Sequence, residues 1–396
     1  MPNMRSTLMA AGAALAVTVT AAYAGQTIKI GNTNPYSGPA SAYGQIGQTI
    51  QACVKMINAE GLLGEDKIEF ISYDDGYSPP KTVEQTRKLI ERDEVVMTFQ
   101  SLGTPTNSAI HKYMNAKKVP HLFVATGASK WGNPGEYPWS MGWQPNYPTE
   151  AKIYAAYILE NIPDAKIAIL FQNDDYGKDY LTGFKEGLGD KADSLIIAES
   201  PYEVADPTID SQIIAFKAAG ANVFFNISTP KFAAQAIRQA AEIDWKPVHF
   251  LNNVSASIGS VIKPAGFEAS QGIITSQYMM DPTDPTFKDH PEYKEWSAFM
   301  DKYYPDGDKT SSFTPYGYAA CKTLLHVLQQ TNGDYSREAI MKSASNIKEL
   351  RVPMLLPGIT IDTSPTDFFP IEAMALARIK GETWERFGDV ISAETE

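Results

Sequence analysis

The stretch KIAILFQNDDYGKDYLTGFKEGL, residues 166–188, decides the fold of this chain. Residues 166–171 are apolar after the first lysine and rich in β-prone types, which is typical of a strand buried on both faces of a sheet. A polar turn follows, and residues 180–188 then have the spacing of a helix. Strand, turn and helix in this order form the repeating unit of a parallel sheet flanked by helices.

The same unit recurs on both sides of this stretch. We predict further strands at residues 27–32, 67–73, 95–99, 120–124, 194–199, 222–226 and 248–251. Helices are expected between them, at residues 82–92, 107–116, 150–161, 208–219 and 231–243, and in a segment that ends near residue 58. Two such runs in 396 residues predict the α/β fold class, with two Rossmann-like lobes that each contain a parallel sheet flanked by helices.

The composition is that of a globular protein, with 43% hydrophobic and 20% charged residues. Acidic residues outnumber basic ones by 46 to 34, which gives a formal net charge of −12. Because an acidic chain without basic runs is a poor partner for phosphate backbones, nucleic-acid binding is not expected.

Residues 1–24 have the features of an export signal. Arg5 supplies a positive charge, residues 8–22 are small and apolar, and Ala22-Tyr23-Ala24 matches a cleavage site. We therefore expect cleavage after Ala24 and a periplasmic location. No later stretch has the roughly 20 consecutive apolar residues that a membrane-spanning helix needs, so the mature chain is not expected to be membrane-embedded.

The chain has two cysteines, Cys53 and Cys321, and each stands in an apolar helical pattern. An oxidising compartment would permit a disulfide between them. Two separate buried thiols are the favoured interpretation, and the alternative stays open at this point.

No catalytic motif stands out in the sequence. It has no G-x-S-x-G elbow, no H-E-x-x-H, no phosphate-binding loop and no C-x-x-C, and its five histidines lack ligand spacing. The acidic stretches 281–289 and 306–308 lack the spacing of a calcium loop. We expect no enzymatic activity, no cofactor and no metal ion.

The segments that follow the predicted strands carry hydroxyls, amides and small residues. Because ligands of open α/β sheets bind at the carboxyl ends of the strands, these residues are candidates for a binding site. Hydroxyls and free N–H groups at helix starts suit a carboxylate, although helix capping uses the same residue types. Aromatic residues that stand near the strand ends are Tyr36, Tyr43, Tyr77, Trp131, Trp143, Tyr147 and Tyr176.

Several motifs taken together resemble one family. These are TIKIGNTNPYSGPASAYG, ISYDDGYSPPK, SLGTPTNSAI, VPHLFVATGASKWG, IAILFQNDDYGKDY and NVFFNISTPKFAAQAIRQA. In their order and spacing they are similar to periplasmic solute-binding proteins of the branched-chain (leucine/isoleucine/valine-type) amino-acid ABC importers.

The resemblance implies a type I periplasmic binding protein, whose two lobes are joined by three crossovers. The matching crossovers lie near residues 143–146, 251–255 and 355–358. The N-terminal lobe would then comprise residues 25–144 and 255–355, and the C-terminal lobe residues 145–254 and 356–396.

The resemblance also implies roles for residues of a ligand site. Hydroxyls and N–H groups of the first lobe would hold a ligand carboxylate, an aromatic side chain would pack on the ligand, and residues of the second lobe would close over it. The matching positions are, for the carboxylate, Ser101, Thr104, Ala125, Thr126 and Gly127; for packing, Tyr43; for closure, Tyr176 and Ser228 or Thr229.

Two positions depart from the family pattern. The loop in which relatives carry an acid for the α-ammonium group reads Asn252-Asn253 here, and an amide compensates a buried charge only in part. Tyr77 and Gln100 stand where some relatives have a disulfide. From the missing acid we expect a small carboxylate ligand with an aromatic or aliphatic body and no obligatory α-amine.

The resemblance implies that the chain is a monomer that delivers its ligand to the membrane permease of an ABC importer. Three alternatives stay open. The chain could be an exported sensor that feeds a signalling receptor, a binder of amides or urea, or a hydrolase with Ser101 as its nucleophile, although no histidine can be assigned beside Ser101.

Overall fold

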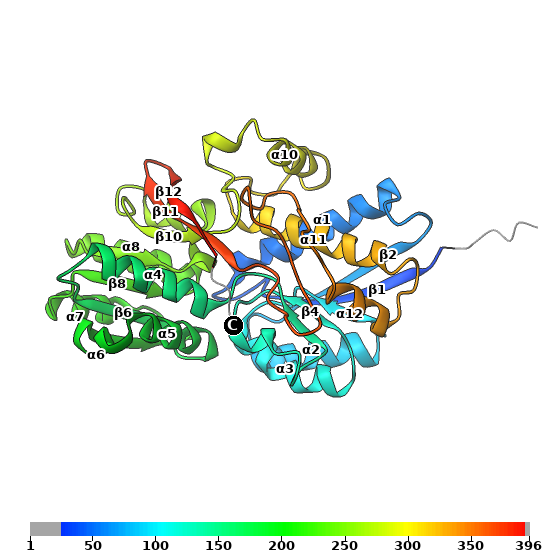
Figure 1. Ribbon diagram of the computed structural model, residues 1–396, viewed down its shortest axis with the longest axis horizontal. Coiled ribbons are helices and arrows are strands. Elements are labelled where there is room, and N and C mark those ends of the chain that lie inside the picture. Colours follow the sequence, from blue (N-terminus) through cyan, green and yellow to red (C-terminus); the bar gives the residue numbers. More distant parts are fainter. Residues whose placement is uncertain (1–24, 393–396) are drawn as a thin grey trace, which may run out of the picture.

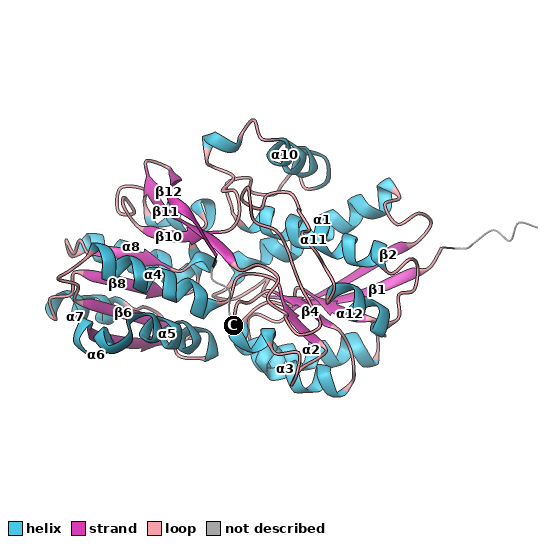
Figure 2. Ribbon diagram, viewed as in Figure 1, coloured by secondary structure: helices cyan, strands magenta, loops and turns pink. Residues whose placement is uncertain are grey.

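Two sheets, each in its own lobe, organise the computed structural model, which describes residues 25–392 (Figure 1). The predicted export signal, residues 1–24, lies outside the described residues. Helices cover the faces of both sheets (Figure 2). The predicted α/β class with two lobes is confirmed.

The first sheet has five parallel strands in the order β2-β1-β3-β4-β5. Its strands are β1 (Thr27–Asn34), β2 (Lys67–Asp74), β3 (Met97–Phe99), β4 (His121–Val124) and β5 (Ser140–Gly142). The helices of this lobe are α1 (Gly44–Glu60), α2 (Pro79–Glu91), α3 (Thr104–Ala116), α10 (Pro291–Tyr303), α11 (Phe313–Gln330) and α12 (Arg337–Ala344), with short turns η1 (Ser41–Tyr43), η2 (Ser129–Gly132) and η6 (Pro285–Phe287).

The second sheet has seven strands in the order β12-β11-β10-β9-β8-β6-β7. Its strands are β6 (Ile167–Gln172), β7 (Ile196–Tyr202), β8 (Val223–Ile227), β9 (Val248–Leu251), β10 (Ile274–Gln277), β11 (Ala373–Lys380) and β12 (Thr383–Ser392). Its α-helices are α4 (Tyr147–Asn161), α5 (Asp175–Leu188), α6 (Ala192–Leu195), α7 (Asp210–Ala218), α8 (Pro230–Glu242) and α9 (Lys263–Ala265). It also contains the short 3-10 helices η3 (Gly189–Lys191) and η4 (Asn253–Ser255) and the π-helix η5 (Ile258–Ile262). Because β11 pairs antiparallel with both β10 and β12, this sheet is mostly rather than wholly parallel.

Helix starts differ from the predicted ones for a local reason. Helix α5 begins at Asp175, five residues before the predicted start, because the Asp174 carboxylate accepts hydrogen bonds from the backbone N–H groups of Tyr176 (3.0 Å) and Gly177 (3.2 Å). Asn146 caps α4 in the same way and places its start at Tyr147. These caps fix two helix starts at the boundary between the lobes.

The second crossover lies later in the chain than expected. Residue Ile274 of β10 pairs with Phe250 of β9, so residues 255–277 belong with the second sheet. The predicted crossover at 251–255 is therefore corrected to the segment that follows Gln277. The polar strand β10, ITSQ, lacks the apolar signature on which the prediction depended.

The third crossover runs beside the second. Met280 donates its backbone N–H to Met354 (2.8 Å), and Leu356 donates to Tyr278 (2.9 Å). The chain then packs on the first lobe again, where Thr363 bonds to Ala344 (2.7 Å), before it enters β11. The C-terminal part of the second lobe therefore begins near β11, at Ala373, and the predicted boundary at 356 lies too early in the chain.

A disulfide joins Cys53 of α1 to Cys321 of α11, with an Sγ–Sγ distance of 2.11 Å. The favoured interpretation of two free thiols is wrong. Helices α1 and α11 lie side by side on the first lobe (Figure 1), and both cysteines are fully buried between them. Sequence spacing could not indicate this contact, because the two residues are 268 positions apart.

Candidate functional site

A cleft lies where the two lobes and the crossover segments meet. It encloses about 810 Å³ of space not filled by atoms, with the solvent at its mouth included. It is lined by Tyr43, Ile46, Tyr77, Leu102, Gly103, Thr104, Ala125, Gln144, Tyr147, Tyr176, Thr229, Asn253, Val254, Ala256, Gln277, Tyr278, Met279, Met280, Asp281, Ser312, Phe313 and Tyr316. Most of these side chains are aromatic, aliphatic or neutral polar, and none of the lining residues in the described chain is Lys, Arg or His.

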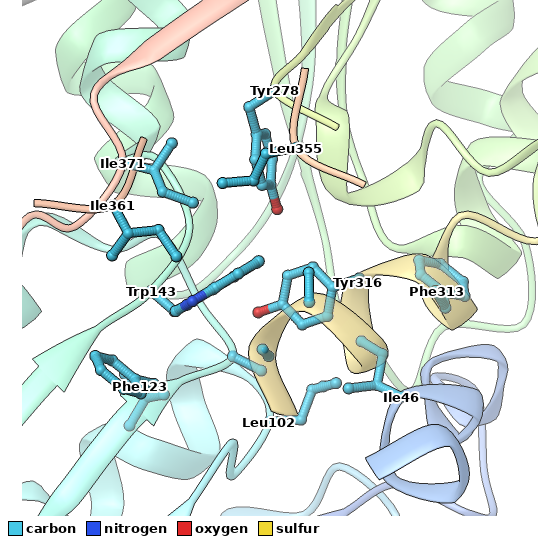
Figure 3. Close-up of a cluster of buried hydrophobic side chains, with 14 of the residues drawn as sticks. Ile46, Leu102, Phe123, Trp143, Tyr278, Phe313, Tyr316, Leu355, Ile361 and Ile371 are labelled. Atoms are coloured by element: carbon cyan, nitrogen blue, oxygen red, sulfur yellow. The ribbon is translucent and has the colours of Figure 1, made fainter. Parts of the chain in front are cut away.

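Aromatic side chains pack together where the crossover segments meet α11, and two of them, Tyr278 and Tyr316, line the cleft. Trp143 packs edge-on against Tyr316 of α11, with ring centroids 5.0 Å apart, and against Tyr278, 6.2 Å away. Figure 3 shows these three rings turned toward one another, with Leu355 beside Tyr278. All three crossovers thus contribute to one apolar cluster at the hinge.

The first lobe presents the start of α3 to the cleft. Gly103 adopts φ of +100°, and a Cβ at this position would lie 2.5 Å from the Tyr77 ring. Only glycine therefore lets Tyr77 reach the cleft wall. The hydroxyl of Thr104, the next residue, lies 2.6 Å from that of Thr126.

The second lobe contributes an aromatic wall. Tyr147 stacks on Tyr180, with centroids 4.4 Å apart, and meets Tyr176 edge-on at 5.3 Å. Thr229, which precedes α8, is held by a hydrogen bond from its backbone N–H to the Tyr202 hydroxyl (2.9 Å). Burial raises the pKa of Tyr147 to about 12, so its hydroxyl stays neutral and can donate a hydrogen bond.

Six of the eleven residues selected from the sequence line the cleft. They are Tyr43, Thr104, Ala125, Tyr176, Thr229 and Asn253. The structure thus brings together residues from the ends of β4, β8 and β9 and from the starts of α3 and α5, as the strand-end argument predicts.

The other five lie behind the cleft wall and support it. Thr126 holds Thr104, and Gly127 accepts a hydrogen bond from the backbone of Tyr147 (2.7 Å). The Asn252 amide lies 2.6 Å from the Tyr176 hydroxyl. Ser228 donates to Asn226, and the Ser101 hydroxyl lies 3.4 Å from the backbone nitrogen of Thr33.

The sequence argument missed the residues that come from the crossovers and from the start of α11. They are Gln144, Gln277, Tyr278, Met279, Met280, Asp281, Ser312, Phe313 and Tyr316. Tyr77 and Tyr147 did carry a signal, since both are aromatic residues near strand ends. Residues 277–281 had none, because they lie at the end of the polar strand β10 and directly after it, and that strand was not predicted.

One missed residue corrects the expectation about charge. Asp281 lines the cleft and is 4% exposed, so the cleft wall does include an acid. Burial raises the pKa of Asp281 to about 6, which leaves the carboxyl mostly ionised at neutral pH. The loop after β9 lacks an acid as expected, but a ligand without an α-amine no longer follows from that loop.

A two-lobed α/β chain with a cleft between its lobes is the architecture of a solute-binding protein. The family model described as periplasmic binding protein matches residues 27–383, and the chain belongs to that family. The resemblance found in the sequence is confirmed at this level.

Known proteins of this architecture are similar over nearly the whole chain. The Leu/Ile/Val-binding protein homolog 7 of Brucella abortus is 23% identical over 338 residues, which are 83% of each chain. A branched-chain amino-acid ABC transporter protein of Thermus thermophilus, solved with bound valine, superposes with a TM-score of 0.84 at 14% identity and covers 93% of this chain and 97% of its own. A fatty acid ABC transporter substrate-binding protein of Thermomonospora curvata gives 0.76 at 19% identity and covers 93% of both chains.

Within residues 25–392, no helix combines the length and the apolar character that crossing a membrane requires. In the same part of the chain, no three His, Cys, Asp or Glu side chains gather as metal ligands would.

Proposed function

We propose that this protein is the periplasmic substrate-binding subunit of an ABC importer and captures a small carboxylate with an aromatic or aliphatic body, apolar amino acids included. The observation that carries the proposal is the cleft, which combines apolar and aromatic walls with a hydroxyl-bearing helix start. A membrane permease would receive the ligand from the closed form. We expect the ligand to leave chemically unchanged and the protein to act as a monomer without cofactor or metal.

The start of α3 is the proposed carboxylate site. The first N–H groups of a helix have no partner within the helix, and its dipole favours negative charge there. In the first turn of α3 these groups come from Thr104 and Thr106, because Pro105 has no N–H. Thr104 adds a hydroxyl, and Ala125 also lines the cleft. Such neutral donors can hold a carboxylate without a lysine or arginine.

The apolar body of the ligand would contact the walls from both sides. Tyr43 and Phe313 meet edge-on with centroids 5.1 Å apart. Ile46 and Leu102, which lie side by side in Figure 3, add apolar surface to the cleft wall. Burial of apolar surface contributes about 25 cal/mol per Å², so affinity should increase with the size of the body until the cleft is full.

The similar proteins support this ligand class. Leucine, isoleucine, valine and fatty acids, which appear in their names, all combine a carboxylate with an apolar body. The named ligands differ in the length of the apolar body and share the carboxylate.

Contacts between the lobes suggest how closure is stabilised. Ser129 of η2 donates from its backbone N–H (2.7 Å) and its hydroxyl (2.8 Å) to the Asp179 carboxylate of α5. Lys130 lies 2.5 Å from Asp175 and holds the pKa of that carboxyl below its usual value. Each contact joins the first lobe to the second, so we expect both to break when the lobes open.

We predict that Asp179→Ala weakens ligand binding by about 5- to 10-fold, because two hydrogen bonds to a carboxylate are lost from the closed form. The loss should appear as faster dissociation in stopped-flow measurements, since an open form lacks these contacts. Glu199→Ala is the matched control, because it breaks an ion pair with Lys185 (2.8 Å) that lies within the second lobe. Equal dissociation rates in the two variants would contradict the role of Asp179.

The proposed function is tested by comparing acids with their amides. Leucine and phenylalanine should raise the melting temperature, because a ligand at 100 times its Kd increases the free energy of unfolding by about 2.7 kcal/mol. Leucinamide and phenylalaninamide should not raise it. Amides that stabilise as well as the acids would favour the amide-binding alternative.

Mass spectrometry of the molecule that co-purifies with the protein identifies the native ligand, and a chemically altered ligand after incubation would indicate an enzyme. Binding of purified permease separates an importer subunit from a sensor.

A further inference from the structure

Two acids near the cleft, the buried Glu150 and the half-buried Asp174, are fully engaged in hydrogen bonds. Glu150 accepts hydrogen bonds from two tyrosine hydroxyls and a backbone N–H, at 2.5 to 2.7 Å. Asp174 accepts from two backbone N–H groups and from a glutamine amide. Neither residue is among those that line the cleft, so both serve the fold.

Asp281 differs from both acids, because it lines the cleft and one of its oxygens has no hydrogen-bond partner among the described residues. It lines the cleft, and its oxygen Oδ1 accepts both available bonds, from the backbone N–H (2.8 Å) and the hydroxyl (2.5 Å) of Thr283. Within residues 25–392, no hydrogen bond or ion pair engages its other oxygen, and the one charge that acts on it is that of Asp284, another acid. Asp281 is therefore a buried carboxylate without a counter-charge in the protein.

Burial of such a carboxylate costs free energy unless a cation pairs with it. A buried carboxylate without a cation is destabilising, and burial of a second carboxylate in the same cleft would add repulsion between like charges. A ligand that carries its own cation removes both costs. The proposed carboxylate site at Thr104 and the acid at Asp281 together suit a ligand with one negative and one positive group.

We propose that Asp281 is the counter-charge for a cationic nitrogen of the ligand, so that the cleft selects carboxylates that carry an amine over the same carboxylates without it. This inference rests on the proposed function and names the substrate class of the same cleft. The acid stands on the second crossover, beside Met280, rather than in the Asn252-Asn253 loop.

The position of Asp281 also connects binding to closure. The crossover that carries it pairs with the third crossover through the bond from Met280 to Met354. A cation held by Asp281 therefore contacts a segment that joins both lobes, which a residue inside one lobe would not provide.

The test compares matched ligands by isothermal titration calorimetry. The pairs are leucine with 4-methylpentanoate and phenylalanine with 3-phenylpropanoate, which differ in the amine alone. Wild-type protein should prefer the amine-bearing member by about 10- to 100-fold, as expected for a hydrogen bond between charged groups. Asp281→Asn should abolish most of this preference, because it weakens binding of the amine-bearing acids and relieves the charge repulsion that opposes the amine-free acids.

Asp284, three residues after Asp281, offers a matched control. Asp284 makes the same turn as Asp281, because its Oδ1 accepts from the backbone N–H (2.8 Å) and the hydroxyl (2.7 Å) of Thr286, but it does not line the cleft. Asp284→Asn should keep the wild-type preference. Thermal unfolding without ligand shows whether both variants are folded.

The outcomes separate the two proposals. The inference is overturned if the acids bind but wild type shows no preference for the amine, or if Asp281→Asn retains that preference. If none of the four acids binds, the proposed function fails, and the inference fails with it.

Discussion

Replacement of both disulfide cysteines, Cys53→Ala with Cys321→Ala, is expected to lower the free energy of unfolding by about 2–5 kcal/mol. The bond joins helices α1 and α11 across 268 residues, with strands β6 to β10 of the second sheet between them in sequence. It therefore restricts a very long loop in the unfolded chain, and loop length increases the stabilisation.

Urea unfolding of the oxidised wild type and the double variant measures the difference. Reduced wild-type protein is the control, since it keeps both side chains and loses the bond alone. A double variant as stable as the oxidised protein would contradict the prediction. Because disulfides persist in oxidising compartments, the bond also supports the proposed periplasmic location.

Thr104→Val is expected to weaken the binding of leucine by about 10- to 100-fold, because it removes a hydrogen-bond donor from a buried anion and keeps the shape of the side chain. The fold should tolerate the change. Thr126 loses the Thr104 hydroxyl but keeps contacts with Trp131 and Tyr147, both at 3.3 Å.

Calorimetric titration of leucine measures the effect. Thr49→Val is the matched control, because Thr49 is a buried helical threonine whose hydroxyl bonds to the carbonyl of Gln45 (2.7 Å) and which does not line the cleft. If Thr104→Val and Thr49→Val bind leucine equally well, Thr104 is not a carboxylate ligand.

Most of the fold could be predicted from the sequence, and the exceptions share a cause. The strands that are apolar throughout, such as β6 and β8, were found because burial on both faces leaves a continuous signal. Strand β10 carries Thr, Ser and Gln, and its place in the sheet depends on pairing with β9 and β11. Because pairing partners are not visible in a local pattern, the second crossover was misplaced.

The site could be predicted in part for the same reason. Residues at strand ends, such as Thr104 and Thr229, follow from the rule that ligands bind where strands end. Whether such a residue lines the cleft or stands behind it depends on the rotation of each loop. Thr126 and Ala125 are adjacent, yet Ala125 lines the cleft while Thr126 supports Thr104.

The sequence by itself determined the α/β class, the two lobes and the family, because strand burial and helix periodicity are local and repeat along the chain. The tertiary structure decided which distant residues meet: the disulfide between Cys53 and Cys321, and the acid Asp281 in a cleft where the sequence indicated none. These contacts depend on how the three crossovers fold against one another, and no spacing along the chain indicates them directly.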